Sequence, residues 1–328
     1  MDAFTAVWGL LTEPWALLML IASLAYAGMN YLDEWLLGHL GGDTPEKKGG
    51  TDAVGTLIII SGLFGILIAL VFVVVDFINT SPDTSVVVKP LSALKAMGAG
   101  MFEVLYLIPY YYATRRAGTM NAAPLFQSIP VISLVLGLLL FKESPPAVHI
   151  IGSLVIVAGA ILLNFAPGTF RLDLRTVGLM LLASTMVSLL FFLFKGAAVG
   201  SNFVAAAFWN GIGMFTASVL ILLTYPPYRR EFCKFMRSID VKSVGIQSIN
   251  EVADAFAGLA SQYAMTIGPS VMAVSALSAY QPVFIFMIGG ILAFAGSKTH
   301  ADQLRGSEFY KKFTAIALIA LGTVLIAQ

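Results

Sequence analysis

The chain has 328 residues, of which 58% are hydrophobic and 11% are charged, whereas soluble domains carry about 25% charged residues. This composition, with a mean hydropathy of +0.88, excludes an ordinary soluble enzyme, and it also excludes disorder, which needs low hydrophobicity. The net charge of +1 gives no reason to expect a nucleic-acid partner.

Residues that commonly carry chemistry are few and scattered. The single cysteine, Cys233, excludes a disulfide framework and a thiolate metal cluster. The three histidines, His39, His149 and His300, form no metal-binding motif, and the sequence has no phosphate-binding loop of the ATPase type. We therefore expect no metal, no cofactor and no enzymatic activity.

Ten apolar segments are long enough to cross a membrane, since a bilayer core about 30 Å thick needs roughly 20 apolar residues in a helix. They are 14–37, 54–78, 91–114, 120–141, 148–165, 174–199, 203–225, 241–265, 270–294 and 309–328, numbered here as spans 1 to 10. Acidic rather than basic residues, Asp2 and Glu13, precede span 1. We therefore interpret span 1 as retained and not as a signal peptide.

Lysine and arginine are distributed unequally between the two faces. Of the 19 basic residues, only Lys89, Lys95, Lys142 and Lys195 lie outside the odd-numbered loops and their flanks. Cytoplasmic loops carry the excess of lysine and arginine. We therefore predict that the odd-numbered loops are cytoplasmic, that both termini lie outside, and that the protein resides in the cell (inner) membrane.

Two halves of the chain, 14–167 and 174–328, carry matching proline motifs. Span 4 contains Gln-Ser-Ile-Pro at 127–130, and span 9 contains Gln-Pro at 281–282. Each span thus has a glutamine shortly before a proline inside the apolar run. These matches favour an internal duplication over two halves that merely share an apolar composition.

A second match concerns acidic residues in the middle of spans 3 and 8. Glu103 is followed by Val104, and Glu251 is followed by Val252. Because five spans per half is an odd number, the second half must enter the membrane from the opposite face, which makes an inverted repeat. In secondary transporters such repeats place the substrate site near the midplane of the membrane, at the repeat interface.

The sequence resembles the EamA type of the drug/metabolite transporter superfamily. The motifs that carry the resemblance lie at 124–130 (Pro-Leu-Phe-Gln-Ser-Ile-Pro), 139–144, 152–163, 194–195 and 280–284. The resemblance implies ten spans arranged as two inverted five-helix repeats, at 14–167 and 174–328, and export of a metabolite or a drug. It also implies cytoplasmic termini. The distribution of basic residues predicts the opposite, and we prefer it because it belongs to this sequence.

Span 8 carries the strongest candidates for a solute pathway. Gln247, Glu251, Asp254, Gly258 and Gln262 follow one another at steps of 4, 3, 4 and 4 residues, which places them on one helix face, and Asn250 lies beside them. An ionisable residue inside a membrane costs about 2.5–3.5 kcal/mol and is a functional candidate by default. The patch could carry a proton, bind a cationic substrate or form a hydrogen-bonded packing seam.

Span 3 offers Glu103, Tyr106 and Tyr110 at steps of 3 and 4, and Pro109 predicts a kink in this helix. A tyrosine provides a ring face and a hydroxyl, which suit an amine or an aromatic solute. For Tyr111, and for Tyr112 beside it, we favour an interfacial aromatic belt.

The other candidates come from spans 1, 4, 6 and 9. Asn30 and Asp33 in span 1 belong either to a site or to a solvated helix end. Lys195 in span 6 either extends to the membrane surface or forms a salt bridge with an inner carboxylate such as Asp254. Gln127 and Gln281 either line a cavity from opposite repeats or bond the backbone groups that the prolines free.

We interpret the chain as an all-α membrane carrier that moves a small organic solute by alternating access, coupled to protons or to exchange. Its cavity is expected between spans 1, 3, 4, 6, 8 and 9. The alternatives are a membrane-embedded enzyme that acts on lipid and a non-transporting subunit or receptor. The expected partners are the solute and the lipid bilayer, and the sequence leaves a homodimer open.

Overall fold

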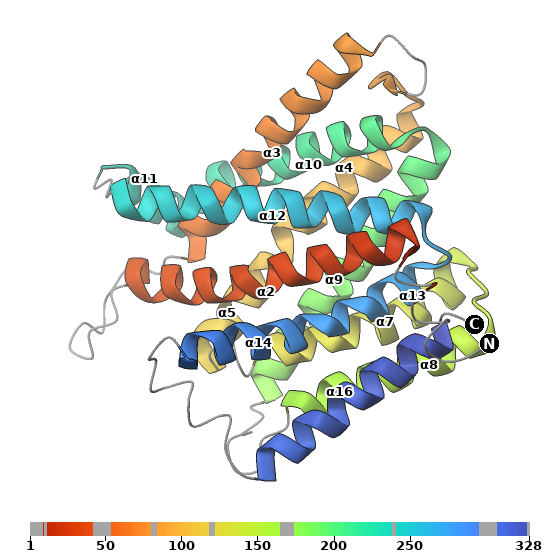
Figure 1. The fold of residues 1–328 in the computed structure, drawn as a ribbon. Helices are drawn as coiled ribbons and strands as arrows, with labels where there is room; N and C mark the ends of the chain where they lie inside the picture. The colour runs from red at the N-terminus through yellow and green to blue at the C-terminus, as the bar shows by residue number, and fades with distance from the viewer. Residues whose placement is uncertain are drawn as a thin grey trace.

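The computed structural model describes residues 9, 12–41, 54–79, 84–117, 122–164, 174–237, 241–294 and 307–326, and within these ranges the chain forms helices and short connections without a strand. The α-helices, labelled as in Figure 1, are α2 (Pro14–Gly41), α3 (Val54–Ile78), α4 (Pro90–Leu105), α5 (Leu107–Ala117), α7 (Ile129–Leu136), α8 (Ala147–Asn164), α9 (Leu174–Gly200), α10 (Phe203–Thr224), α11 (Pro226–Arg237), α12 (Val241–Ile267), α13 (Val271–Ala276), α14 (Gln281–Phe294) and α16 (Ser307–Ile326). Shorter elements are the 3₁₀ helices η2 (Ala123–Ser128) and η4 (Leu277–Tyr280) and the π-helix η3 (Gly137–Phe141). The predicted all-α class is confirmed for these residues.

Every predicted span is helical over its described residues except at Tyr106, Tyr225 and Ser270. Five helical stretches within the described ranges are long and apolar enough to cross a membrane, namely Pro14–Leu37, Val54–Ile78, Pro90–Ala117, Leu174–Gly200 and Phe203–Thr224. Spans 4, 5, 9 and 10 correspond to shorter apolar helices. Span 8 corresponds to α12, which has 27 residues and carries the polar stripe.

Span 3 is broken where the sequence predicts a kink. Pro109 has no N–H, and its ring displaces the carbonyl four residues earlier, that of Leu105. Helix α4 ends at Leu105, and α5 begins after Tyr106. Pro130 and Pro282 act in the same way, because each is the second residue of an α-helix that continues a 3₁₀ turn.

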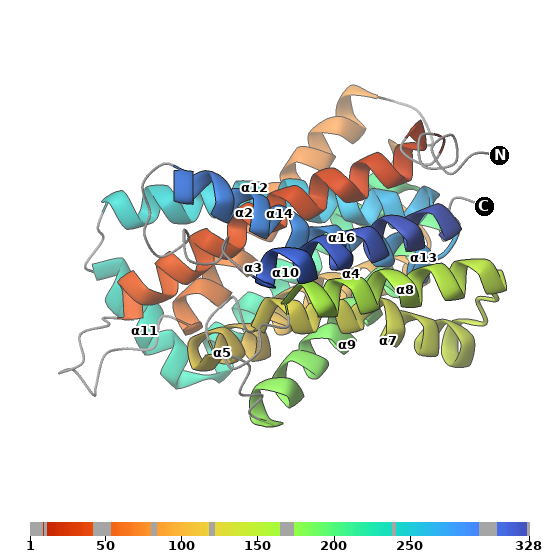
Figure 2. The same cartoon turned by 60° about the horizontal axis from the view of Figure 1, so that its bottom comes forward.

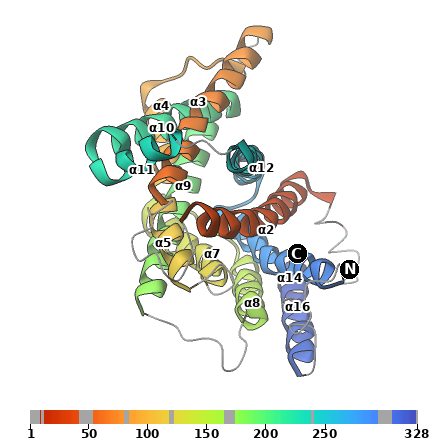
Figure 3. The ribbon, with the colours of Figure 1, turned by 90° about the vertical axis from the view of Figure 1, so that its left-hand side faces the viewer.

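Glycines allow several helix pairs to approach closely, as is common at helix interfaces in membranes. Gly100 of α4 lies directly against the backbone carbonyl of Asn210 in α10. At the interface of α8 with α16, a Cβ added to Gly152 would lie 2.8 Å from the carbonyl oxygen of Gly322. At the interface of α3 with α10, a Cβ added to Gly65 would lie closer still to the carbonyl oxygen of Gly211. Seen down the bundle, the α3–α10 pair and the α8–α16 pair lie at opposite edges, with α2, α9 and α12 between them (Figure 3).

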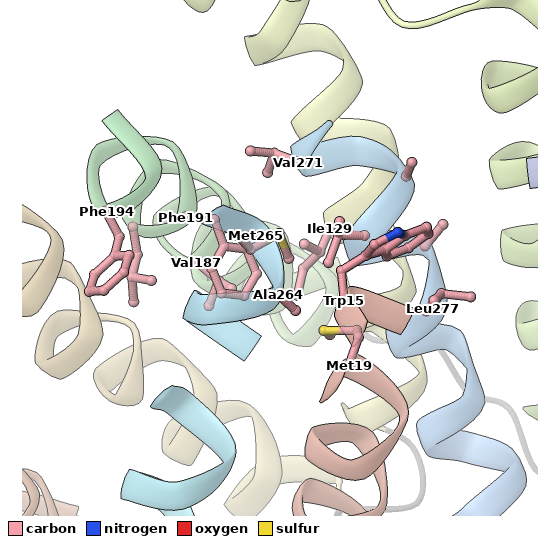
Figure 4. Packing of buried hydrophobic residues seen from close by; sticks show 14 of the residues in the cluster. Trp15, Met19, Ile129, Val187, Phe191, Phe194, Ala264, Met265, Val271 and Leu277 are labelled. Carbon is pink, nitrogen blue, oxygen red and sulfur yellow. The ribbon is translucent and has the colours of Figure 1, made fainter. Parts of the chain in front are cut away.

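Two hydrophobic clusters stabilise the two ends of the bundle. The first joins Trp15 at the start of α2 to Val271 and to Ile326 near the end of α16, and Figure 4 shows part of it. The second joins Leu36 near the end of α2 to Tyr228 of α11. Helix α11 thus lies at the end of the bundle opposite to α13 (Figures 1 and 2). Four partly buried residues pack against both clusters: Phe72, Tyr106, Phe126 and Leu259.

Many large apolar side chains face outward. Phe77 is 85% exposed, and Leu139, Leu174 and Val252 are also largely exposed, on four different helices. Soluble proteins rarely expose apolar patches of this extent, whereas lipid tails solvate them without cost. The exposed surface therefore agrees with the membrane location that the composition predicts.

Helix α11 is attached to the bundle by polar contacts. The backbone N–H of Gly55 donates a hydrogen bond of 2.9 Å to Oε2 of Glu231, and the Tyr228 hydroxyl lies 3.1 Å from that of Tyr112. Burial raises the pKa of Glu231 from 4.5 to about 7, although the Gly55 hydrogen bond and the charge of Arg115 act in the opposite direction.

This pKa predicts how stability depends on pH. Because the pKa of Glu231 is higher in the folded than in the unfolded state, the folded protein binds more protons between these two values, and stability falls as the pH rises through this window. We expect the melting temperature to fall between about pH 5 and pH 8, and we expect Glu231→Gln to reduce this fall. Thermal unfolding of both proteins in detergent, at about pH 5 and about pH 8, measures the fall in melting temperature. An identical fall in the variant would contradict the prediction.

Candidate functional site

A central cavity of about 100 Å³ lies between the helices of the two halves. Its walls come from α2, α3, α4, α5, η2 and α7 of the first half and from α9, α12, η4 and α14 of the second. All six spans that we expected to surround a cavity contribute, and span 2 joins them through Ser61. Of the eleven candidates, nine line the cavity: Asn30, Asp33, Glu103, Tyr106, Tyr110, Asn250, Glu251, Asp254 and Gln281.

Glu103 receives two hydrogen bonds from the second half of the chain. The side-chain amide of Asn210 in α10 donates to its Oε2 over 2.6 Å, and that of Gln262 in α12 donates to the same oxygen over 3.0 Å. Both donors reach Oε2, which leaves Oε1 for the cavity. Within the described part of the chain, Glu103 is thereby held in place by two neutral groups and by no basic side chain.

Glu251 is held in a similar way, but from the first half. The Ser61 hydroxyl of α3 donates a hydrogen bond of 2.6 Å to its Oε1, and the Gln247 amide, one helical turn earlier in α12, donates to the same oxygen. Glu251 is 3% exposed. A carboxyl group so deeply buried needs such donors, because an unpaired buried charge is costly.

Asp33 completes a third contact between the two halves. The Asn250 amide of α12 donates a hydrogen bond of 2.9 Å to its Oδ1, and the Tyr110 hydroxyl lies 3.1 Å from its Oδ2. That hydroxyl also lies 3.1 Å from Oδ1 of Asn30. Asp33 is buried, so the alternative that it marks a solvated helix end is wrong.

Asp254 differs from the other three acids. It lines the cavity one turn after Glu251, yet no hydrogen bond to its carboxyl group is found among the described residues. Its position on α12 follows from the helical spacing that the sequence shows. Of the four acids, it therefore has the carboxyl group with the fewest internal partners to lose when a ligand binds.

Two alternatives and one expectation from the sequence need correction. Lys195 does not reach Asp254, because its ammonium nitrogen lies 3.3 Å from Oε1 of Glu143, away from the cavity. The other carboxylate oxygen of Glu143 accepts a hydrogen bond of 3.2 Å from the backbone N–H of Val271. Glu143 lies in the connection after span 4, and Lys195 pairs with it there.

The other two corrections concern Gln127 and Tyr111. Gln127 is buried outside the cavity, so the two glutamines do not line it as a pair, and only Gln281 does. Tyr111 is not part of an interfacial belt, because it is 2% exposed and lines the cavity. Tyr111 lies on α5, after the interruption of the helix at Tyr106.

Ser61 and Phe126 are cavity residues that the sequence did not single out. Ser61 is a hydroxyl within the apolar run of span 2, and such a group must find a hydrogen-bond partner. Phe126 belongs to the motif at 124–130, and its ring packs against those of Tyr106 and Tyr110, with centroids 6.4 and 5.3 Å apart. An isolated polar residue in an apolar run was thus an available signal for Ser61.

The four cavity acids do not form a metal-binding cluster. Among the described residues, no group of three or more His, Cys, Asp or Glu side chains lies close enough to hold a metal ion. The acids are instead distributed over α2, α4 and α12, and each has a different environment.

Comparisons with known proteins agree with this architecture. Residues 13–165 match the model of the EamA-like transporter family. The matched region covers a little under half of the chain. This match supports the resemblance to the drug/metabolite transporter superfamily for the first half of the chain, and together with the apolar helices it supports a multi-pass integral membrane protein. EamA-like proteins are transporters rather than enzymes.

One solved structure, titled only "Crystal structure of protein", matches with a TM-score of 0.62 and 17% identity, over 95% of each chain. At this identity the likeness shows a shared fold alone. Among curated proteins, no sequence matches this chain.

Proposed function

We propose that this EamA-like protein is a secondary transporter that moves a small organic solute through the central cavity by alternating access between two inverted five-helix repeats, 14–167 and 174–328. Transport is coupled to protons or to exchange of a second solute. The observation that carries the proposal is that the hydrogen bonds of three cavity acids connect the two halves.

The register of the cavity residues supports the repeat. Glu103, Tyr106 and Tyr110 of span 3 lie at the same spacing as Glu251, Asp254 and Gly258 of span 8, and all six line the cavity. Glu103 of span 3 is bonded by Asn210 of span 7, and Glu251 of span 8 is bonded by Ser61 of span 2. In the repeat, span 3 corresponds to span 8 and span 7 corresponds to span 2. The two hydrogen bonds therefore join equivalent pairs of spans.

Helix packing follows the same rule. Helix α9 (span 6) packs on α4 (span 3), as α2 (span 1) packs on α12 (span 8). Spans 4 and 9 contact each other, as do spans 5 and 10 and spans 2 and 7. Span 1 corresponds to span 6, span 2 to span 7, and so on. If each span in these contacts is replaced by its counterpart, the same set of contacts results. That is the relation expected for two repeats with a shared two-fold axis.

The bonds between the halves suggest how protons enter the cycle. If one repeat moves against the other, the bonds of Glu103, Glu251 and Asp33 must break or change partner. Protonation removes the negative charge that makes these bonds strong. The proton occupancy of the acids therefore biases the two orientations, which is the requirement for coupling.

Uptake into proteoliposomes tests this function. We expect at least one solute of a metabolite panel to enter faster when a pH gradient is imposed, and we expect Glu251→Gln to abolish the stimulation. The Asp76→Asn variant, with its carboxyl group outside the cavity, is the control. If no solute moves, either along a gradient or in exchange with trapped solute, the proposal is wrong.

The orientation in the membrane gives a separate prediction. Four basic residues of α11, Arg229, Arg230, Lys234 and Arg237, are exposed at the end of the bundle opposite to Trp15. We expect α11 to face the cytoplasm, because cytoplasmic loops carry the excess of basic residues. In intact cells, Cys233 on this helix should then resist an impermeant thiol reagent, and Gln328→Cys in a Cys233→Ser background should react. Labelling in the reverse order would favour cytoplasmic termini.

A further inference from the structure

We propose that the substrate class of this cavity is a small organic cation, with an amine or another donor-rich cationic group attached to an apolar or aromatic body. The inference rests on the proposed transport function and adds the chemistry of the solute. It draws on three features of the cavity: its charge, its unpaired polar groups and its aromatic wall.

The charge of the lining residues has one sign. Asp33, Glu103, Glu251 and Asp254 face the cavity, and no lysine, arginine or histidine is among the described residues that line it. The hydrogen-bond donors that reach Glu103 and Glu251 are neutral amides and a hydroxyl. Charged side chains inside a membrane normally pair with one another. Here the balancing positive charge must come from protons or from a ligand.

The hydrogen-bonding capacity of the cavity is also asymmetric. Oδ1 of Asn250 and Oε1 of Gln262 are buried without a partner, on residues that are 3% and 2% exposed and that line the cavity. Nδ2 of Asn30 is the single unpaired donor among these buried lining groups. Oε1 of Glu103 and the carboxyl group of Asp254 add further acceptors. Most of the unpaired polar atoms that line the cavity are therefore hydrogen-bond acceptors. An ammonium group has three donors and no acceptor, and so matches this set.

The aromatic part of the cavity wall suits an apolar body. Tyr106, Tyr110 and Phe126 form a continuous aromatic surface, and Met19 and Phe191 extend the apolar lining. A cation over the face of an aromatic ring is attracted by its quadrupole, most strongly when water is excluded. An anionic solute would instead meet four carboxyl groups with no basic residue to receive it.

Cation binding and proton binding then exclude each other. When the cation enters, its charge replaces that of the protons that neutralise the carboxyl groups, and these protons leave to the same side. When the cation is released, protons from the other side take its place. This competition converts a proton gradient into cation export, and it needs no further ion.

Three probes that share one ring and one chain length isolate the charge: 2-phenylethylamine, 2-phenylethanol and phenylacetate. Calorimetric titration of the purified protein in detergent should detect binding of the amine and not of the other two. Titration in two buffers with different ionisation enthalpies should show that amine binding releases protons. Glu103→Gln and Asp254→Asn should weaken amine binding about tenfold or more, which corresponds to about 1.4 kcal/mol. Asp76→Asn, whose carboxyl group lies outside the cavity, should leave binding unchanged.

The outcomes separate this inference from the transport function. Equal or tighter binding of phenylacetate or 2-phenylethanol overturns the cation assignment. Amine binding that is unchanged in both Glu103→Gln and Asp254→Asn overturns it as well. Binding of Mn²⁺ at the same acids without amine binding also overturns it. If a neutral or anionic solute is transported in a Glu251-dependent manner while amines are not, the substrate class is wrong and the transport function stands. If amines bind but nothing crosses the membrane, the cation site stands and the transport function is wrong.

Discussion

Glu251→Gln is expected to abolish the coupled component of transport while leaving the protein folded. The amide has the same shape as the carboxyl group, and its Oε1 can still accept the hydrogen bonds from Ser61 and Gln247 that now reach Oε1 of Glu251. It cannot bind or release a proton. We expect uptake driven by a pH gradient to fall at least tenfold. A tenfold fall in rate corresponds to about 1.4 kcal/mol of activation free energy. Exchange of bound solute should be less affected.

The pH profile of transport identifies which acids carry the proton. Glu251 and Asp254 lie one turn apart on α12, and carboxyl groups that share a low-dielectric site share protons and titrate together. Glu103 is the only acid on its helix that faces the cavity. We therefore expect Glu251→Gln and Asp254→Asn to shift the pH profile more than Glu103→Gln does, although all three should impair transport. Unchanged pH profiles in both α12 variants would show that this pair does not carry the proton. The pair would then be a cation site or a packing seam.

Gly100→Val is expected to produce the largest loss of stability. A side chain at this position would collide with the backbone of Asn210 in α10, and backbone atoms cannot rotate away. Overpacking of this kind costs about 1–3 kcal/mol or more. Because Asn210 donates the 2.6 Å hydrogen bond to Glu103, a shift of α10 would also disturb the cavity. We expect a lower melting temperature and a lower yield of monodisperse protein.

Gly28→Val is the matched control for this experiment. It introduces the same side chain into another helix of the bundle, at a position where no atom beyond the adjoining residues and backbone of its own helix lies within 4 Å of the added Cβ. Valine and glycine have helix propensities that differ by less than about 1 kcal/mol, so little change is expected. If Gly100→Val is as stable as Gly28→Val, the close approach of α4 and α10 is not a feature of the folded protein.

The sequence determines the helices of this protein and the faces of each helix. Spans are recognised because the bilayer thickness demands a minimum length of apolar residues, and α3 begins and ends where the hydrophobic run does. The interruption before α5 follows from Pro109, since proline removes a backbone donor wherever it stands. The stripe on α12 follows from the helical period of 3.6 residues. These properties depend only on neighbours along the chain.

The sequence also restricts the candidate site, because polar residues are rare in apolar runs and each needs an explanation. Nine of the eleven candidates line one cavity. Gln127 and Lys195 carry the same kind of sequence signal but lie elsewhere. A polar residue within a span thus indicates that its side chain needs a hydrogen-bond or ion-pair partner. It does not indicate which residue that partner is.

Only the tertiary structure decides which helix faces meet. The hydrogen bonds of Ser61 with Glu251 and of Asn210 with Glu103 join residues far apart in the sequence, and their geometry depends on the rotation of each helix about its axis. Helical periodicity defines a face but leaves that rotation free. The rotation is settled by contacts between helices, for example where Gly100 allows the backbones of α4 and α10 to touch. For the same reason Lys195 pairs with Glu143 and not with Asp254, because the nearest acid in space depends on packing and not on the distribution of charge along the chain.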